Sequence, residues 1–506
     1  MKSVYLKLFR CELRRLEKKG GFRAVERYIT TCEAYFQKRE YQLVALLEKA
    51  RLGFLMGRWD DCLALLDQVG SEESLLEPDD KALLYLVNAK LHQGYGDLNQ
   101  SLTFLELALA EAEHGEGLTS IEANLEMAAL FHRIGEHERG QEFLHETEAL
   151  LKVKPDRRLA SRLAFEKGLV GVRSERLEDA EDLFKLSLAC LGKNDMGSIQ
   201  RGEGLRFLGI LACLDGRPVE GLKFQKQALE CHQALPYRMG VAKTYNSLGQ
   251  TCLKLGRYQE ALYFLELAEQ ICREVGAEAE RAMVFGKLGS VYTKLGLYEK
   301  AIAYQKKDLE ISSSVGNYRA LAFSLRNLGL SYKASGDLQK AVQYLRDSRD
   351  RFAELEDLAF QVKADLDLVA ALLEHDRITE AFGFLEDAQE LLDKRFDVTG
   401  DHVNARYFAG VIALDTENFH RAEQMLWQAL EMAKALSLQT SQADIHYQLA
   451  RLYVKKNDSV AAIEELRSSY RLARRLSLDR LTGKIVSQLH ELDPEALFNE
   501  LISPGF

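Results

Sequence analysis

The stretch that decides the fold is YNSLGQTCLKLGRYQEALYFLELA, residues 245–268, because its pattern returns twice in the chain that follows. It recurs as FGKLGSVYTKLGLYEKAIAYQKKD at 285–308 and as LRNLGLSYKASGDLQKAVQYLRDS at 325–348. Each segment has a small residue, a turn glycine seven positions later, and another small residue five positions after that. Self-similarity at a fixed period of a few tens of residues indicates a protein built from structural repeats.

The same pattern extends along most of the chain at spacings of 39 to 41 residues. The predicted turn positions are Gly57, Gly96, Gly135, Glu175, Gly216, Gly256, Gly296, Gly336, Asp376, Glu417 and Asn457. Seven residues before the turn, ten of the eleven residues are Gly or Ala, and five residues after it all eleven are small. Because helical side chains surround these positions, the pattern predicts about eleven helix–turn–helix repeats.

Helix packing explains why small residues recur at fixed positions in each repeat. Glycine inside a helix costs about 1 kcal/mol relative to alanine, so a recurring helical glycine needs compensation. Close approach of the two helices of one repeat supplies it, because only small residues let the backbones lie together. At the turn, glycine adopts the left-handed conformation that ends a helix. Glu175 and Glu417 adopt it poorly, which leaves open a different turn at those two positions.

The pattern resembles the tetratricopeptide repeat family over roughly residues 40–479. The usual period of that family is 34 residues, whereas the period here is about 40. In this it is similar to the longer repeats of Pins-like polarity adaptors, kinesin light chains and bacterial peptide-sensing regulators. The resemblance implies an all-α, right-handed α-solenoid of about eleven repeats with helical caps at both ends.

Three parts are expected along the chain. Residues 1–39 form a basic helical hairpin or a degenerate repeat, residues 40–479 form the superhelix, and residues 480–506 form a capping helix and tail. Residues 1–39 carry eleven Lys and Arg against four Glu, a charge of +7 in a chain of net charge −10. This hairpin is either a solvated helix face or a contact for an acidic partner or membrane surface.

Several function classes are disfavoured. A net charge of −10 argues against general nucleic-acid binding. The N-terminus has no signal peptide, and no stretch has the length of a membrane span, so a cytoplasmic location is expected. There is no phosphate-binding loop, and the dispersed histidines and cysteines lack metal-ligand spacing. We therefore predict no catalytic residue, metal or cofactor, and a protein that is not an enzyme.

A partner site follows from the resemblance, because the first helix of each tetratricopeptide repeat lines the concave groove where family members bind peptides. Counting from the small residue of each first helix gives ten inward candidates. They are Lys243, Asn246, Gln250, Lys254, Lys287, Ser290, Lys294, Arg326, Asn327 and Lys333. This tract has no acidic residue. Its side chains either keep the groove solvated or recognise an acidic segment. In the second case the Asn side chains pair with the main chain of the segment, and Lys and Arg pair with its carboxylates.

The sequence thus predicts a scaffold or adaptor that holds a protein or peptide partner, possibly an acidic one, in its groove. The alternative is a bacterial-type signalling sensor or regulator, in which the solenoid binds a peptide or a small GTPase and modulates an output partner. Neither the identity of the partner nor the oligomeric state follows from the sequence.

Overall fold

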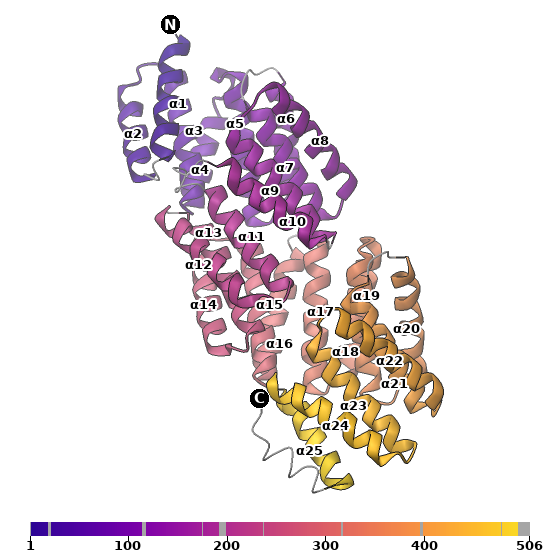
Figure 1. The fold of residues 1–506 in the computed structure, drawn as a ribbon. Helices are drawn as coiled ribbons and strands as arrows, with labels where there is room; N and C mark the ends of the chain where they lie inside the picture. The colour runs from indigo at the N-terminus through magenta and orange to yellow at the C-terminus, as the bar shows by residue number, and fades with distance from the viewer. Residues whose placement is uncertain are drawn as a thin grey trace. The chain divides into compact units, whose positions relative to one another are not determined.

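The computed structural model describes residues 2–18, 22–113, 118–174, 176–191, 199–235, 237–314, 317–394, 398–476 and 478–493 (Figure 1). Within these ranges the regular structure is helical and contains no strand, which confirms the predicted all-α repeat fold. No helix among these residues is both long and apolar enough to cross a bilayer. The chain divides into two compact units, unit 1 (Met1–Asn327) and unit 2 (Leu328–Phe506). The predicted boundaries at residues 39/40 and 479/480 stay predictions.

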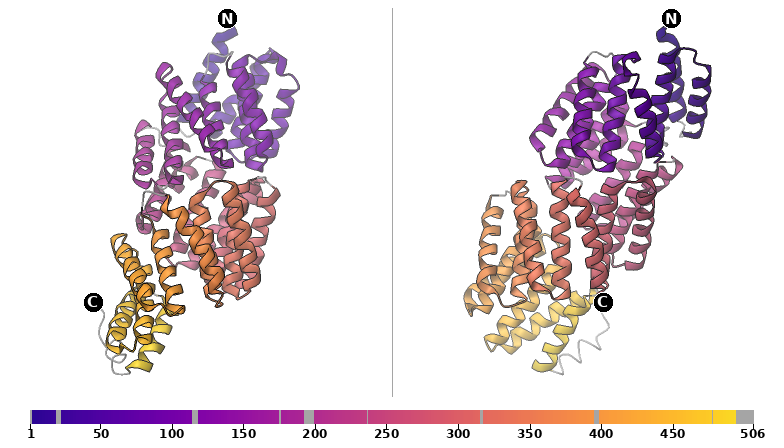
Figure 2. Two further views of the ribbon diagram at one scale, coloured as in Figure 1. Left: turned by 90° about the vertical axis from the view of Figure 1, so that its right-hand side faces the viewer. Right: turned by 180° about the vertical axis from the view of Figure 1, so that it is seen from behind.

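Unit 1 begins with two helices that precede the repeats, α1 (Lys2–Lys18) and α2 (Phe22–Tyr35) (Figures 1 and 2). Seven repeats follow, each a pair of helices, with a short 3₁₀ turn η1 (Glu73–Leu75) after the first pair. The pairs are α3 (Arg39–Leu55) and α4 (Trp59–Gly70), α5 (Pro78–Tyr95) and α6 (Leu98–Ala112), α7 (Thr119–Ile134) and α8 (His137–Val153), α9 (Arg157–Arg173) and α10 (Leu177–Cys190), α11 (Ile199–Leu214) and α12 (Pro218–Ala234), α13 (Arg238–Lys254) and α14 (Tyr258–Val275), and α15 (Glu278–Lys294) and α16 (Tyr298–Ser314).

Unit 2 contains the remaining repeats and a final helix. Helix α17 (Tyr318–Ser335) begins in unit 1 and forms the eighth repeat with α18 (Leu338–Glu354). The other pairs are α19 (Leu358–Leu373) and α20 (Ile378–Asp393), α21 (Gly400–Asp415) and α22 (Phe419–Ala435), and α23 (Gln439–Lys455) and α24 (Ser459–Arg475). Helix α25 (Asp479–Leu492), in yellow at the end of the chain in Figure 1, buries Ile485 and Leu489 against α24 and so covers the last repeat.

The turns inside the repeats have the predicted left-handed backbone. The turn glycines of unit 1 have φ between 71° and 98°, and Gly336 in unit 2 has φ 87°. Asp376, Glu417 and Asn457 reach φ 57°, 59° and 59° without being glycine. The different turn that the sequence left open at Glu417 is therefore wrong, because packing of the flanking helices imposes the same conformation there. Glu175 lies outside the described residues.

The small residues bring the two helices of a repeat into backbone contact. A Cβ added at Gly209 would lie 2.8 Å from the carbonyl oxygen of Gly221, the small residue after the turn. The same construction places a Cβ at Gly249 3.3 Å from the carbonyl oxygen of Ala261, and one at Gly329 3.2 Å from that of Ala341. A methyl group at Gly209 would overlap the facing backbone, and at Gly249 and Gly329 it would be in tight contact with it, so glycine permits the close helix crossing in these three repeats.

Substitution of Gly209 by alanine tests this requirement. Gly209→Ala should lower the free energy of unfolding by about 1–3 kcal/mol, because the methyl group overpacks a backbone contact. Gly383→Ala in α20 is the matched control, since a Cβ there meets nothing within 4 Å. It should be neutral or stabilising by up to about 1 kcal/mol. Urea unfolding followed by circular dichroism measures both, and equal effects would contradict the packing explanation.

A contact between distant repeats distinguishes unit 1 from a simple stack, in which each repeat touches only its neighbours. One hydrophobic cluster joins residues of α1 to α5 with Met239, Val275 and Ala277 from the sixth and seventh repeats. At the turn of the first repeat, a Cβ on Gly57 would lie 2.9 Å from Cγ2 of Val275. Figure 1 shows α13 directly beneath α4, and α5 also contacts α15. The first two repeats of unit 1 are thus held against its sixth and seventh.

Removing two methyl groups from this contact should loosen helices far away in the sequence. Val275→Ala is expected to cost roughly 1–2 kcal/mol and to speed amide hydrogen exchange in α3 and α5. Val284→Ala is the matched control, because Val284 is also buried but packs within the cluster of α13 to α15. Exchange measured by mass spectrometry should change in α3 and α5 for the first variant only. If both variants leave those helices unchanged, the long-range contact does not stabilise them.

A charged surface on the first helices of unit 1

The first helices of unit 1 are linked to one another by polar side chains. Glu126 of α7 accepts a hydrogen bond from Arg162 of α9 at 2.6 Å and lies 3.1 Å from the Nζ of Lys90 in α5. Glu126 is buried, which by itself raises its pKa, but the two cations outweigh burial and lower the pKa to about 2. The carboxylate of Glu126, paired with a cation on each side, therefore links the three consecutive first helices α5, α7 and α9.

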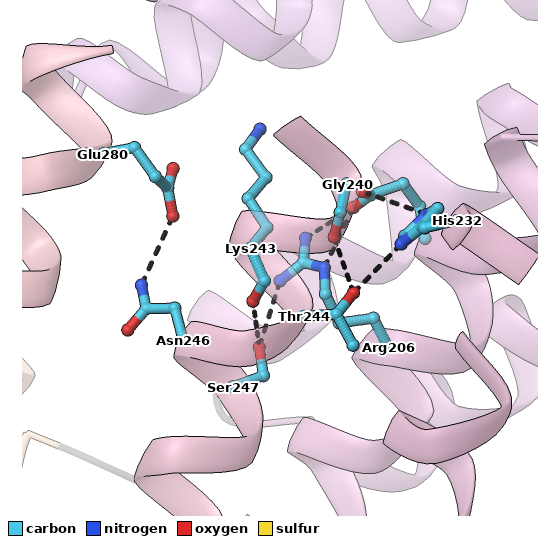
Figure 3. A network of polar contacts seen from close by, with 9 residues as sticks. Arg206, His232, Gly240, Lys243, Thr244, Asn246, Ser247 and Glu280 are labelled. Carbon is cyan, nitrogen blue, oxygen red and sulfur yellow. Dashed lines mark hydrogen bonds and ion pairs between the residues drawn. The ribbon is translucent and has the colours of Figure 1, made fainter. Parts of the chain in front are cut away.

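A second group of contacts joins α11 to α13 and surrounds His232 (Figure 3). Arg206 of α11 pairs with Glu203 on its own helix and donates a long hydrogen bond of 3.5 Å to the Oγ of Ser247. Burial would raise the pKa of Glu203, but Arg206 and His232 outweigh it and hold the pKa at about 2. This end of the surface is thus also tied across two neighbouring repeats.

His232 is fully buried, and its environment sets its protonation. The hydroxyl of Thr244 donates to the carbonyl oxygen of Gly240 at 2.7 Å, so it accepts from Nδ1 of His232 at 3.0 Å. The pKa of His232 is lowered by burial, which favours the neutral ring with its proton on Nδ1. Gly202 makes room for the ring, since a Cβ there would lie 2.2 Å from Nε2. This glycine is thus a packing residue inside helix α11.

Two predicted lysines on adjacent first helices lack a counter-ion. Within the described ranges, no carboxylate lies at ion-pair distance from Lys243 of α13 or Lys287 of α15, and neither amine has a hydrogen-bond acceptor. Figure 3 shows the amine of Lys243 extending away from the residues drawn around it. The pKa of Lys287 is lowered to about 8, chiefly by burial, with Arg206 lowering it further and Glu280 opposing. Acidic side chains therefore act on these lysines only through space, Glu203 on Lys243 and Glu280 on Lys287.

The other predicted residues of unit 1 differ in how available they are. Asn246 is only 4% exposed and donates from Nδ2 to Oε1 of Glu280 at 3.3 Å, while its Oδ1 is buried without a partner among the described atoms. Ser290 bonds back to its own helix at the carbonyl oxygen of Gly286, 2.9 Å away. Three residues near the C-terminal ends of α13 and α15 are exposed: Gln250, Lys254 and Lys294.

The last three predicted residues lie at the division between the units. Arg326 and Asn327 are half-buried on α17 at the end of unit 1. Lys333 belongs to unit 2, where it forms an ion pair with Glu374 at 3.5 Å. The contacts described above therefore bring together only those predicted residues that lie on α13 and α15. A binding role for all ten predicted groove residues stays a prediction.

Sequence reasoning missed the acidic side chains of this surface. Glu280 stands before the positions counted inward from Gly289, so the count predicts a tract free of acid, yet Glu280 contacts Asn246. A signal was present, because Glu280 is seven residues before Lys287 and two helical turns bring both to one face of α15. Glu203 likewise lies three residues before Arg206, a spacing that brings both side chains to one face of α11.

Comparison with known proteins agrees with the repeat geometry. Residues 201–274 and 280–354 match the sequence model of the tetratricopeptide repeat. These residues are tetratricopeptide repeats. No curated protein matches this sequence.

Solved structures with the same fold are distant in sequence. A Rap protein complexed with competence and sporulation factor gives a TM-score of 0.55 at 13% identity, over 71% of this chain and 99% of that chain. The apo form of RapI gives 0.50 at 14% identity, over 71% and 98%. A human IFIT1 dimer with m7Gppp-AAAA gives 0.50 at 16% identity, over 83% and 90%. At such identities the likeness shows the fold alone.

The burial of the Lys287 amine should be visible in the pH dependence of stability. Its folded pKa of about 8 lies below the unfolded value of about 10.4. Between these values the unfolded chain holds a proton that the folded protein lacks, so the lysine's destabilising effect fades as pH rises. Lys287→Met should therefore stabilise at pH 7, and the gain should shrink towards pH 10.

Urea unfolding at both pH values measures this difference. Lys306→Met is the control, because Lys306 is an exposed lysine on the second helix α16. It should leave the free energy of unfolding unchanged at either pH. A Lys287→Met gain that is the same at pH 7 and pH 10 would show that the effect comes from packing and not from charge.

Proposed function

We propose that this chain is a non-enzymatic scaffold that holds an acidic segment of a partner protein on the surface formed by α11, α13 and α15. The observation that carries the proposal is a pair of lysines on adjacent first helices, Lys243 and Lys287, neither of which has an ion-pair partner among the described residues. A half-buried ammonium without a counter-ion is unfavourable, and a ligand carboxylate that pairs with it recovers that free energy on binding.

Neighbouring groups suit an extended acidic segment. The buried Asn246 has an unused acceptor that a main-chain N–H of the segment can satisfy. The exposed Lys254 and Lys294 lie further along the same two helices and offer further cations to acidic side chains. The residues on α13 and α15 thus supply one main-chain contact and several charge contacts.

The chemistry of the ligand is argued from these residues and not from the similar structures. The Rap structure holds competence and sporulation factor and the IFIT1 structure holds m7Gppp-AAAA, so proteins of this fold bind ligands of different chemistry. In this chain the cations share the surface with Glu203 and Glu280, and the net charge is −10. That mixture disfavours a long polyanion such as RNA and suits a segment with a few spaced carboxylates.

A labelled decaglutamate peptide tests the proposal without knowledge of the partner. Fluorescence anisotropy at low salt should show saturable binding to the wild-type chain, and Lys287→Met should weaken it about tenfold because one charge contact is lost. Lys306→Met should bind as the wild type does. A decaglutamine peptide reports binding that does not depend on charge. No binding of decaglutamate, or binding that Lys287→Met leaves unchanged, would refute a groove for acidic segments on this surface.

A further inference from the structure

Glu280 makes an unusual contact at the centre of the proposed surface. It lies on the first turn of α15 with 9% of its surface exposed, and Oε1 accepts from Nδ2 of Asn246 at 3.3 Å (Figure 3). Among the described residues no Lys, Arg or His nitrogen lies within ion-pair distance of its carboxylate. A buried carboxylate is ordinarily paired with a cation, whereas this one is held by a neutral amide.

The contact is also weak and incomplete. A separation of 3.3 Å is beyond the usual range for an N–H···O hydrogen bond, which is commonly about 2.9–3.0 Å. Asn246 uses only its donor side, and its Oδ1 remains buried without a partner among the described atoms. A peptide that presents a carboxylate to Nδ2 and a main-chain N–H to Oδ1 would satisfy both halves of this amide. A bound peptide can therefore replace the hydrogen bond between Glu280 and Asn246 with stronger and more complete hydrogen bonding to the Asn246 amide.

Glu280 also opposes a second carboxylate near the lysines. It acts on Lys287 through space, where its charge raises the pKa of the amine that burial lowers. The two residues are two helical turns apart on one face of α15, a rise of about 10 Å, so they interact without touching. A ligand carboxylate at Lys287 would meet the field of Glu280 while gaining that of the lysine.

We infer that Glu280 is a built-in competitor for the acidic segment, occupying the Asn246 amide in the free protein and giving it up when a partner carboxylate arrives. This inference rests on the proposed function above. Glu280 is then a specificity-determining residue. A single ligand carboxylate must displace the Glu280 side chain from Asn246 and bind in spite of repulsion by the charge of Glu280. Segments with a second acidic residue, able to reach Lys243 as well as Lys287, overcome this opposition. Segments with one do not.

Glu280→Gln separates the charge of this side chain from its shape. The glutamine keeps an oxygen for the Nδ2 of Asn246, so the fold is preserved while the competing charge is removed. Decaglutamate should bind Glu280→Gln about tenfold more tightly than the wild type. Glu278→Gln is the matched control, because Glu278 lies on the same helical turn but pairs with Arg281 at 3.1 Å. It should change the affinity less than twofold.

A double variant and a second peptide complete the test. Adding Lys287→Met to Glu280→Gln should abolish most of the gain, because the competitor acts on a carboxylate bound at that lysine. A peptide with one glutamate among nine glutamines should bind the wild type too weakly to measure and bind Glu280→Gln measurably. If wild-type binding depends on Lys287 but Glu280→Gln leaves it unchanged or weaker, the competitor role is overturned and the groove stands. If wild-type binding does not depend on Lys287, the proposed function itself falls.

Discussion

The backbone contact between the two helices of each repeat is the constraint on which the rest of the structure depends. The carbonyl oxygen of Gly221 lies 2.8 Å from the position of a Cβ on Gly209, so the helices cross more closely than a side chain at Gly209 would allow. Repetition of that crossing about every 40 residues orients each first helix in the same way. Residues at a fixed offset from the small residue, such as Lys254 and Lys294, each five residues after it, therefore come to corresponding places on successive helices.

This explains which parts of the fold could be predicted from sequence. The turns and small residues are local features that recur in nearly every repeat, so the amino-acid pattern alone is enough to predict both. At Glu417 the sequence left the conformation of the predicted turn open, because glutamate has no local preference for it. A left-handed glutamate costs roughly 1–2 kcal/mol as an isolated residue, yet it has φ 59° because two packed helices leave the connection no alternative. Tertiary packing outweighs a local preference of that size.

Two features depend on information that a repeat pattern lacks. The contact of Gly57 with Val275 joins the first repeat to the sixth, and it depends on how rotation accumulates over five repeats, which no single repeat specifies. The contact of Glu280 with Asn246 crosses from one first helix to the next. Counting positions within each helix placed Asn246 at the surface but could not show which neighbour would reach it.

Charge compensation then separates this surface into two parts with different capacities. Around Glu126 the cations Lys90 and Arg162 already satisfy the carboxylate, so a ligand there would have to break contacts before making its own. Around Asn246 the two lysines have no counter-ion among the described residues and the amide is half used, so a ligand gains contacts that the protein lacks. Free energy for binding is available where the folded chain has left charges uncompensated. That favours α13 and α15 over α7 and α9, although both pairs are rich in charge.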